Sequence, residues 1–131
     1  MIVVDTHIVL WDALDPARLS RKAKTAINRA DKSDGIVICD ITLWEIAMLI
    51  DRERITVEVP YNEFMKLVLA SRQYTVHPIT PEIAQRSMDC LPPGYGDPAD
   101  RLIAATALVA GIPLITADKG LRDAIVIRTI W

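Results

Sequence analysis

Short continuous runs of apolar residues alternate with helically spaced ones along the chain. A short apolar run is typical of a strand buried on both faces of a parallel sheet, whereas apolar residues three or four positions apart are typical of a helix. The runs predict strands at 2–4, 36–39, 74–79, 113–116 and 124–130. The helical spacing predicts helices at 21–30, 43–50, 60–72, 97–111 and 117–123, and one that starts at 81 and ends before 92.

Several polar residues mark where these helices begin. Ser20 and Thr80 are candidate N-caps, because a short side-chain oxygen there accepts from a free backbone N–H of the first turn. Thr42 and Glu45 have the spacing of a capping box. The stretch 92–96, Pro-Pro-Gly-Tyr-Gly, has the composition of a surface loop.

Alternating strands and helices predict an α/β domain, a three-layer α/β/α sandwich around a mainly parallel sheet of about five strands. The 131 residues, without linker or internal repeat, predict a single domain over 1–131. Of these residues 51% are hydrophobic, which excludes a disordered chain, yet no stretch is apolar for long enough to cross a membrane. Cys39 and Cys90 match no metal-binding spacing, so we expect buried free thiols and a cytoplasmic protein.

The net charge of −2 argues against a protein that coats nucleic acid by bulk electrostatics. The charge is unevenly spread, however. Between residues 15 and 34, six basic side chains face only three acidic ones, so the rest of the chain is correspondingly acidic. The position of those acids in the fold is therefore more informative about function than their number.

Acidic residues recur where predicted strands end and where helices begin. In an open parallel sheet, these points meet at one edge, the edge at which ligands bind. The acids placed there are Asp5 and Asp40 directly after the first two strands, Glu45, Asp97 and Asp100 at a helix start, and Asp118 after the fourth strand. We expect them to form one acidic cluster.

Each acid also has a simpler explanation as a helix cap or as a charge favoured by the helix dipole. Taken together, these explanations leave several carboxylates crowded in a partly dry pocket, where they repel unless a cation or bound protons compensate. Oxygen ligands without histidine or cysteine clusters favour Mg²⁺ or Mn²⁺, ions that commonly serve phosphate chemistry.

Four motifs carry a resemblance to a known family. They are Asp5-Thr6-His7 after an apolar strand, Leu43-Trp44-Glu45-Ile46-Ala47, Asp97-Pro98-Ala99-Asp100-Arg101-Leu102-Ile103-Ala104-Ala105, and Leu114-Ile115-Thr116-Ala117-Asp118. In this order they resemble the PIN domain, and more narrowly the VapC-type toxins of bacterial and archaeal toxin–antitoxin pairs. The resemblance covers essentially the whole chain.

The resemblance implies an endoribonuclease that depends on Mg²⁺ or Mn²⁺ and hydrolyses RNA with an activated water, leaving a 5′-phosphate and a 3′-hydroxyl. By motif position, the catalytic and metal-binding tetrad is Asp5, Glu45, Asp100 and Asp118. Three accessory residues are Asp97, which either contacts water bound to the metal or only caps its helix, and Thr6 and Thr116, whose hydroxyls either orient carboxylates or only satisfy backbone groups.

The resemblance also implies partners: an RNA substrate, a cognate antitoxin whose arginine-bearing tail enters the acidic pocket, and a homodimer or a heteromeric complex, with no membrane. Arg21 and Lys22 of the basic segment are candidates for steering RNA, and Arg101 is a candidate phosphate contact or ion-pair partner. We expect structural roles for both histidines, and core or interface packing for Trp11 and Trp44.

Two other classes of protein remain open from the residues alone. One is an aspartate-based phosphotransfer or receiver-like signalling domain on a related α/β fold, although His7 stands where a haloacid dehalogenase needs an acid and Lys119 follows Asp118 beyond its strand. The other is a binding module whose pocket is inactive, which the complete set of acids argues against.

Overall fold

The computed structural model describes residues 1–131 and confirms the α/β class. Five parallel strands form one sheet in the order β3-β2-β1-β4-β5. They are β1 (Ile2–Val4), β2 (Ile36–Cys39), β3 (Tyr74–His77), β4 (Leu114–Ile115) and β5 (Thr129–Ile130). The last strand is much shorter than the predicted 124–130, because Ile125 is 99% exposed and Ile127 turns back to donate to the carbonyl of Ala124.

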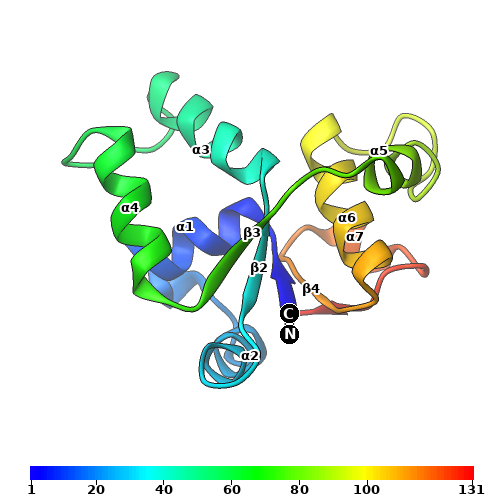
Figure 1. Ribbon diagram of the computed structural model, residues 1–131, viewed down its shortest axis with the longest axis horizontal. Helices are drawn as coiled ribbons and strands as arrows, with labels where there is room; N and C mark the ends of the chain where they lie inside the picture. Colours follow the sequence, from blue (N-terminus) through cyan, green and yellow to red (C-terminus); the bar gives the residue numbers. More distant parts are fainter.

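The strands are connected by seven α-helices and one 3₁₀ helix, η1 (Pro16–Arg18) (Figure 1). The α-helices are α1 (Thr6–Leu14), α2 (Arg21–Asp31), α3 (Ile41–Asp51), α4 (Tyr61–Ser71), α5 (Pro81–Ser87), α6 (Pro98–Ala110) and α7 (Lys119–Asp123). Helix α1 was not predicted, since its sequence is apolar almost throughout and shows no helical stripe.

The first residues of three helices show whether the predicted N-caps form. The hydroxyl oxygens of Ser20 and Thr80 accept from backbone N–H groups three residues on, as predicted. The predicted capping box is wrong: α3 begins two residues earlier than predicted, so Thr42 lies inside its first turn and is fully buried. The Glu45 carboxylate instead accepts from Thr6 on α1.

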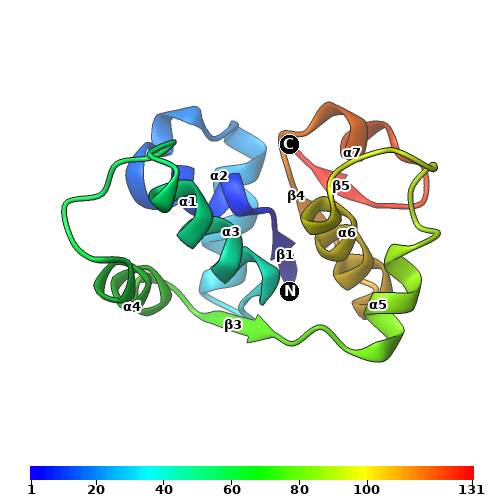
Figure 2. The ribbon, with the colours of Figure 1, turned by 90° about the horizontal axis from the view of Figure 1, so that it is seen from above.

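Alternate residues of each strand face two separate cores. Val4, Ile38 and Ile115 pack with α1 to α4, whereas Val3, Val37 and Leu114 pack with α5 to α7. The two groups of helices lie on opposite sides of the sheet in Figures 1 and 2. The predicted three-layer arrangement is therefore confirmed.

The strand order places β1 beside both β2 and β4. The chain runs from β1 outward through β2 to β3, then crosses to β4 on the other side of β1, and the covering helices change face at this point. A parallel sheet with such a reversal opens a crevice at the carboxyl ends of the strands that flank it. Here those strands are β1 and β4.

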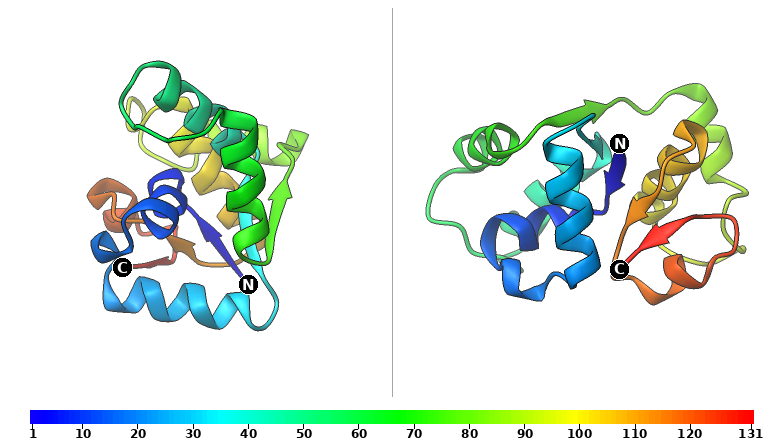
Figure 3. Two further views of the ribbon diagram at one scale, coloured as in Figure 1. Left: turned by 90° about the vertical axis from the view of Figure 1, so that its left-hand side faces the viewer. Right: turned by 90° about the horizontal axis from the view of Figure 1, so that it is seen from below.

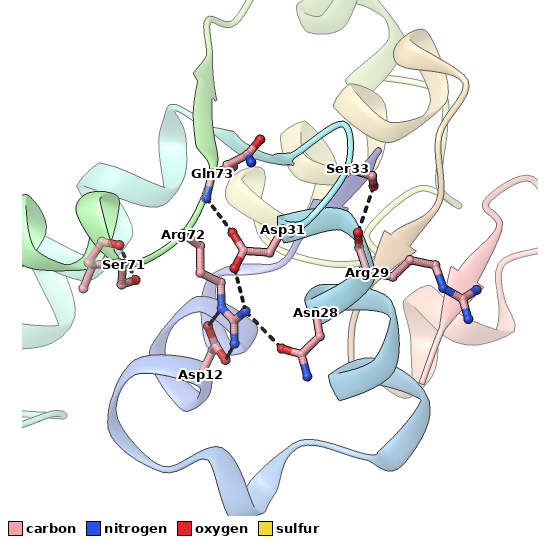
Figure 4. A network of polar contacts seen from close by, with 9 residues as sticks. Asp12, Asn28, Arg29, Asp31, Ser33, Ser71, Arg72 and Gln73 are labelled. Carbon is pink, nitrogen blue, oxygen red and sulfur yellow. Dashed lines mark hydrogen bonds and ion pairs between the residues drawn. The ribbon is translucent and has the colours of Figure 1, made fainter.

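A polar network fastens the layer of α1, α2 and α4 at the α4–β3 junction (Figure 4). The Arg72 guanidinium donates twice to the Asp12 carboxylate, at 2.6 and 2.9 Å, and once each to Asn28 and Asp31. Asp31 also accepts from the backbone N–H of Gln73 at 2.7 Å. These hydrogen bonds pair the polar groups with one another and connect α1, α2 and the α4–β3 junction.

Other predictions concern single side chains. Cys39 and Cys90 are buried free thiols, as predicted. Trp11 stacks at a tilt against Trp131 and is partly buried, whereas Trp44 is 57% exposed and so takes no part in the core. None of the helices is long and apolar enough to span a bilayer.

Candidate active site

Asp5 lies where β1 ends and caps α1. Its Oδ1 accepts from the Thr6 backbone N–H at 2.7 Å, and its Oδ2 accepts from the Thr116 hydroxyl at 2.8 Å. Only 7% of the residue is exposed. Burial raises the pKa of Asp5, although the hydrogen bonds from Thr116 and Thr6 oppose this rise. A buried carboxylate is thus fixed at the carboxyl end of β1.

Glu45 points from α3 toward the same place and is 8% exposed. Its Oε1 accepts from the Thr6 hydroxyl at 2.5 Å, and that hydroxyl lies 3.1 Å from the Thr42 hydroxyl. Burial raises the pKa of Glu45, and the charges of Asp97 and Asp5 raise it further. Thr6 therefore touches two of the acids, Asp5 through its backbone and Glu45 through its side chain.

Asp97 directly precedes α6, and Asp100 lies in its first turn. Asp97 caps the helix by accepting from the Asp100 backbone N–H at 2.9 Å. Burial, followed by repulsion from Asp5, Asp97, Glu45 and Asp118, raises the pKa of Asp100 to about 7. Asp100 thus lies within electrostatic reach of four of the other acids predicted at this edge, and Asp40, the sixth, accepts from the backbone N–H of Ile79 at 3.2 Å.

Asp118 follows β4 and caps α7. Its Oδ1 accepts from the Leu121 backbone N–H at 3.0 Å and from the Tyr95 hydroxyl at 2.5 Å. Burial alone would raise the pKa of Asp118, but these hydrogen bonds lower it below its ordinary value. The Thr116 hydroxyl oxygen accepts from the Asp118 backbone N–H and donates to Asp5, so it connects the two strand ends.

The donor chemistry of this cluster fits a hard divalent cation, since all five groups offer carboxylate oxygen and none offers sulfur or imidazole nitrogen. No three Asp, Glu, His or Cys side chains are arranged to hold an ion together directly. An ion held by these acids as they stand would need water among its ligands. Mg²⁺ commonly binds in this way, with water completing its coordination.

The predicted basic residues lie apart from this cluster. Arg21 and Lys22 are exposed on α2, which lies beneath the sheet in Figures 1 and 3, whereas α6 begins at the upper side of Figure 1. Arg101 is adjacent to Asp100 in sequence, yet all five of its guanidinium N–H donors go to backbone carbonyls. Those carbonyls belong to Ser87, Met88, Leu91, Pro92 and Tyr95.

Two residues near the acids were not selected from the sequence. Tyr95 donates to Asp118, but its position in a Gly- and Pro-rich loop carries no signal that it reaches an acid. His7 is exposed at the start of α1, and its coulombic interaction with Asp5 and Glu45 opposes the rise in the pKa of each. Its place directly after Asp5-Thr6 was the feature of the sequence that could have indicated that His7 lies near the acids.

A groove of about 470 Å³ extends from the cluster along α1 and α3. Glu45 and Asp97 line its inner end, and His7 and Trp11 line its wall. Its outer part includes Arg54 and Arg18, and the Arg18 guanidinium lies 4.6 Å from the centre of the Trp11 ring. The groove therefore connects Glu45 and Asp97 with a part that holds two arginines and one acid, Asp15.

Comparison with known proteins gives a consistent result. Residues 2–126 match the family model described as PIN domain. The chain is 38% identical over 123 residues, 93% of this chain and 90% of the relative, to a Mycobacterium tuberculosis protein named Ribonuclease VapC22.

Solved structures have the same fold at lower identity. A toxin–antitoxin complex from Klebsiella pneumoniae gives a TM-score of 0.65 at 21% identity, covering 95% of this chain and 92% of that one. VapBC2 from Rickettsia felis, bound to a DNA fragment from its promoter, gives 0.69 at 16% identity, covering 98% and 97%. The chain therefore belongs to the PIN-domain family and is a VapC-like member of it.

Proposed function

We propose that this protein is a Mg²⁺- or Mn²⁺-dependent endoribonuclease that acts as the toxin of a toxin–antitoxin pair. The observation that carries the proposal is the convergence of five carboxylates at the carboxyl edge of the sheet near β1 and β4, where burial and their mutual repulsion raise the pKa of Asp100 to about 7. Such crowding is unfavourable without a compensating cation. The 38% identical relative named as a ribonuclease supports the same activity.

The proposed roles follow from how each acid is held. Asp5, Asp100 and Asp118 are the direct or water-mediated ligands, and Glu45 joins them from α3. When bound, Mg²⁺ or Mn²⁺ supplies a lowered pKa for an attacking water and neutralises charge developing on the phosphate. Thr6 and Thr116 orient Glu45 and Asp5 through their hydroxyls, and Asp97 holds the start of α6.

Covalent catalysis by a cysteine is disfavoured. Cys39 is fully buried and Cys90 is 4% exposed, so neither thiol reaches a bound phosphodiester. Burial also raises the pKa of both thiols, which keeps them protonated and weakly nucleophilic. Hydrolysis by water held among the carboxylates is the chemistry we propose instead.

The groove along α1 and α3 is the path we assign to the RNA backbone. It opens at Glu45 and Asp97 and reaches Arg18 and Arg54, whose charges attract phosphates. Arg18 belongs to the basic segment identified in the sequence, whereas Arg21 and Lys22 on α2 serve at most in long-range steering.

A cognate antitoxin is the partner we propose. The structural neighbours include toxin–antitoxin complexes from several bacteria, one bound to promoter DNA, and their shared fold is consistent with such an assembly. Self-association is proposed as well, because Trp44 is 57% exposed beside a groove of about 520 Å³ that reaches Pro98.

Asp5→Asn and Asp100→Asn test the activity. Purified variants are incubated with RNA in Mn²⁺ or Mg²⁺, and product ends are mapped by sequencing. We expect cleavage in the wild-type protein to require metal and to be abolished in both variants, with unchanged circular dichroism. Glu58→Gln, which removes an exposed carboxylate outside every helix and strand, is the matched control and should cleave normally. Full cleavage by both aspartate variants would contradict the proposal.

A phosphorylated aspartate, the alternative open from the sequence, gains no support from the geometry. Lys119, the candidate receiver lysine, is 84% exposed and pairs with Asp123 on its own helix at 2.6 Å. Incubation with acetyl phosphate tests it directly, since a receiver domain forms a stable aspartyl phosphate and a nuclease does not.

A further inference from the structure

The loop between α5 and α6 is tied down by one side chain. Arg101, on the second turn of α6, uses all five guanidinium N–H groups on carbonyls of residues 87–95, at 2.8 to 3.2 Å. One acceptor is the carbonyl of Tyr95 itself, at 2.9 Å. A planar fork with five donors fixes the path of a chain more tightly than a single bond does. Arg101 therefore determines where Tyr95 lies.

The Tyr95 side chain reaches across to the start of α7 and packs on Gly120. A Cβ atom at position 120 would lie 1.8 Å from the Tyr95 hydroxyl oxygen and 2.2 Å from Cζ, closer than any real contact allows. Gly120 has no positive φ that would require glycine. The absence of a side chain at Gly120 is therefore explained by the room that the tyrosine ring needs.

The same ring brings its hydroxyl to Asp118. The Tyr95 hydroxyl and the Leu121 backbone N–H both donate to Oδ1, so the carboxylate is held from two directions. The contact continues inward, because the Asp118 backbone N–H donates to Thr116, whose hydroxyl donates to Asp5. A loop outside the sheet is thereby connected to two acids at its centre.

We propose that Tyr95 is a positioning residue that orients the Asp118 carboxylate for metal binding and RNA hydrolysis, with Arg101 and Gly120 fixing its place. Its catalytic meaning rests on the proposed nuclease function. Groups that hydrogen-bond to metal ligands commonly change metal affinity or activity by 10- to 100-fold when removed. Tyr95 donates such a hydrogen bond to Asp118, a proposed metal ligand.

Tyr95→Phe removes the hydroxyl and keeps the ring on Gly120. We expect the dissociation constant for Mn²⁺, measured by titration calorimetry, to rise roughly 10-fold or more. In RNA cleavage at saturating RNA, kcat should fall while KM for RNA stays nearly constant, because the tyrosine acts on the acid and not on the substrate. Tyr61→Phe is the matched control, since it removes a tyrosine hydroxyl that donates to the carbonyl of Leu43 at 2.6 Å.

Gly120→Ala tests the packing independently. Alanine favours helix over glycine, so the substitution should raise the melting temperature unless it displaces the ring. We expect it to lower the melting temperature and to weaken Mn²⁺ binding as Tyr95→Phe does. Tyr95→Ala removes the ring and with it the clash. The double variant Tyr95→Ala/Gly120→Ala should therefore bind Mn²⁺ as Tyr95→Ala alone does and have a higher melting temperature than Tyr95→Ala.

Arg101→Gln should weaken Mn²⁺ binding as well, and Arg101→Lys should retain part of it, because lysine keeps three of the five donors. Normal Mn²⁺ affinity in Tyr95→Phe and in Gly120→Ala would overturn the proposal even if the wild-type protein cleaves RNA. Conversely, a wild-type protein that binds Mn²⁺ without cleaving RNA would refute the nuclease function. The Mn²⁺ affinities of the wild-type protein and Tyr95→Phe would still decide whether Tyr95 orients Asp118.

Discussion

Removing the charge of Asp100 should stabilise the metal-free protein at neutral pH while abolishing its proposed activity. The pKa of this carboxyl group lies at about 7, against an ordinary value of 3.8, because it is partly buried and faces four other acids. Its ionisation is therefore opposed by the folded state. Asp100→Asn keeps the size of the side chain and removes that opposition.

The magnitude follows from the difference between the two pKa values, which corresponds to at most about 4 kcal/mol. Asp100 is only partly buried, and screening by solvent reduces this figure to about 2 kcal/mol. Asparagine also gives up a favourable interaction with the α6 dipole, worth about 0.5 kcal/mol. A net gain of about 1.5 kcal/mol remains, or about 5 °C in Tm for a chain of this length.

The sign depends on pH. Because the folded pKa is raised, the folded state holds more protons than the unfolded state between about pH 4 and pH 7. The wild-type protein should therefore lose stability as pH rises through this window, and Asp100→Asn should lose less. At pH 4, close to the unfolded pKa of 3.8, Asp100 is protonated in the folded state and only part of its ionisation is opposed by folding, so most of the advantage of the variant should disappear.

The assay is thermal unfolding in EDTA at pH 4, 6 and 8, followed by circular dichroism, with Glu58→Gln as the control for loss of one exposed carboxylate. Added Mn²⁺ should raise the Tm of the wild-type protein more than that of the variant, since the ion removes the same repulsion. A variant that melts at or below the wild-type temperature at pH 8, or one whose gain is equal at all three values, would refute the reasoning.

Three further outcomes are expected. Arg72→Leu should lower the free energy of unfolding by about 2 kcal/mol in urea denaturation, because it leaves the Asp12 carboxylate, 11% exposed, without its partner; an unchanged midpoint would show the network to be dispensable. Thr6→Val should cost about 1–2 kcal/mol by depriving buried Glu45 of its donor, and Thr25→Val on exposed α2 should cost less. Both cysteines are buried, so a thiol reagent should label neither in the native protein and both in denaturant; rapid native labelling would contradict this burial.

Much of the fold was predictable because its signals are local. Apolar runs identified all five strands, and Ser20 and Thr80 marked helix starts correctly. Helix α1 was missed because it is apolar almost throughout, exposed Ala13 and Leu14 included, so no polar stripe reveals its period. The last strand was overextended because Ile125 and Val126 are apolar yet exposed, and composition alone does not distinguish the two cases.

The candidate site was predictable to the extent that topology determines it. The acids after β1 and β4 and at the start of α6 had to meet at one edge once the sheet was parallel. The surroundings of each acid were not predictable, because they depend on side chains distant in sequence: Thr6 reaches Glu45 across 39 positions, and Tyr95 reaches Asp118 across 23. Arg101 illustrates the same limit, since its neighbour Asp100 suggested an electrostatic role and its actual acceptors are carbonyls.

From the sequence, each acid could be a helix cap or a member of the proposed acidic site. The structure shows that a residue can cap a helix and still lie among the other acids. Asp5, Asp97 and Asp118 each cap a helix that begins at the carboxyl edge, so backbone N–H groups offset part of their charge and fix their orientation. Glu45 and Asp100 cap nothing, and burial and repulsion raise the pKa of each. The fold can thus assemble without metal, because three of the acids contribute to helix formation. The caps do not offset all of the repulsion, because the pKa values of Asp5, Glu45 and Asp100 all remain raised, and this repulsion is what the proposed cation would relieve.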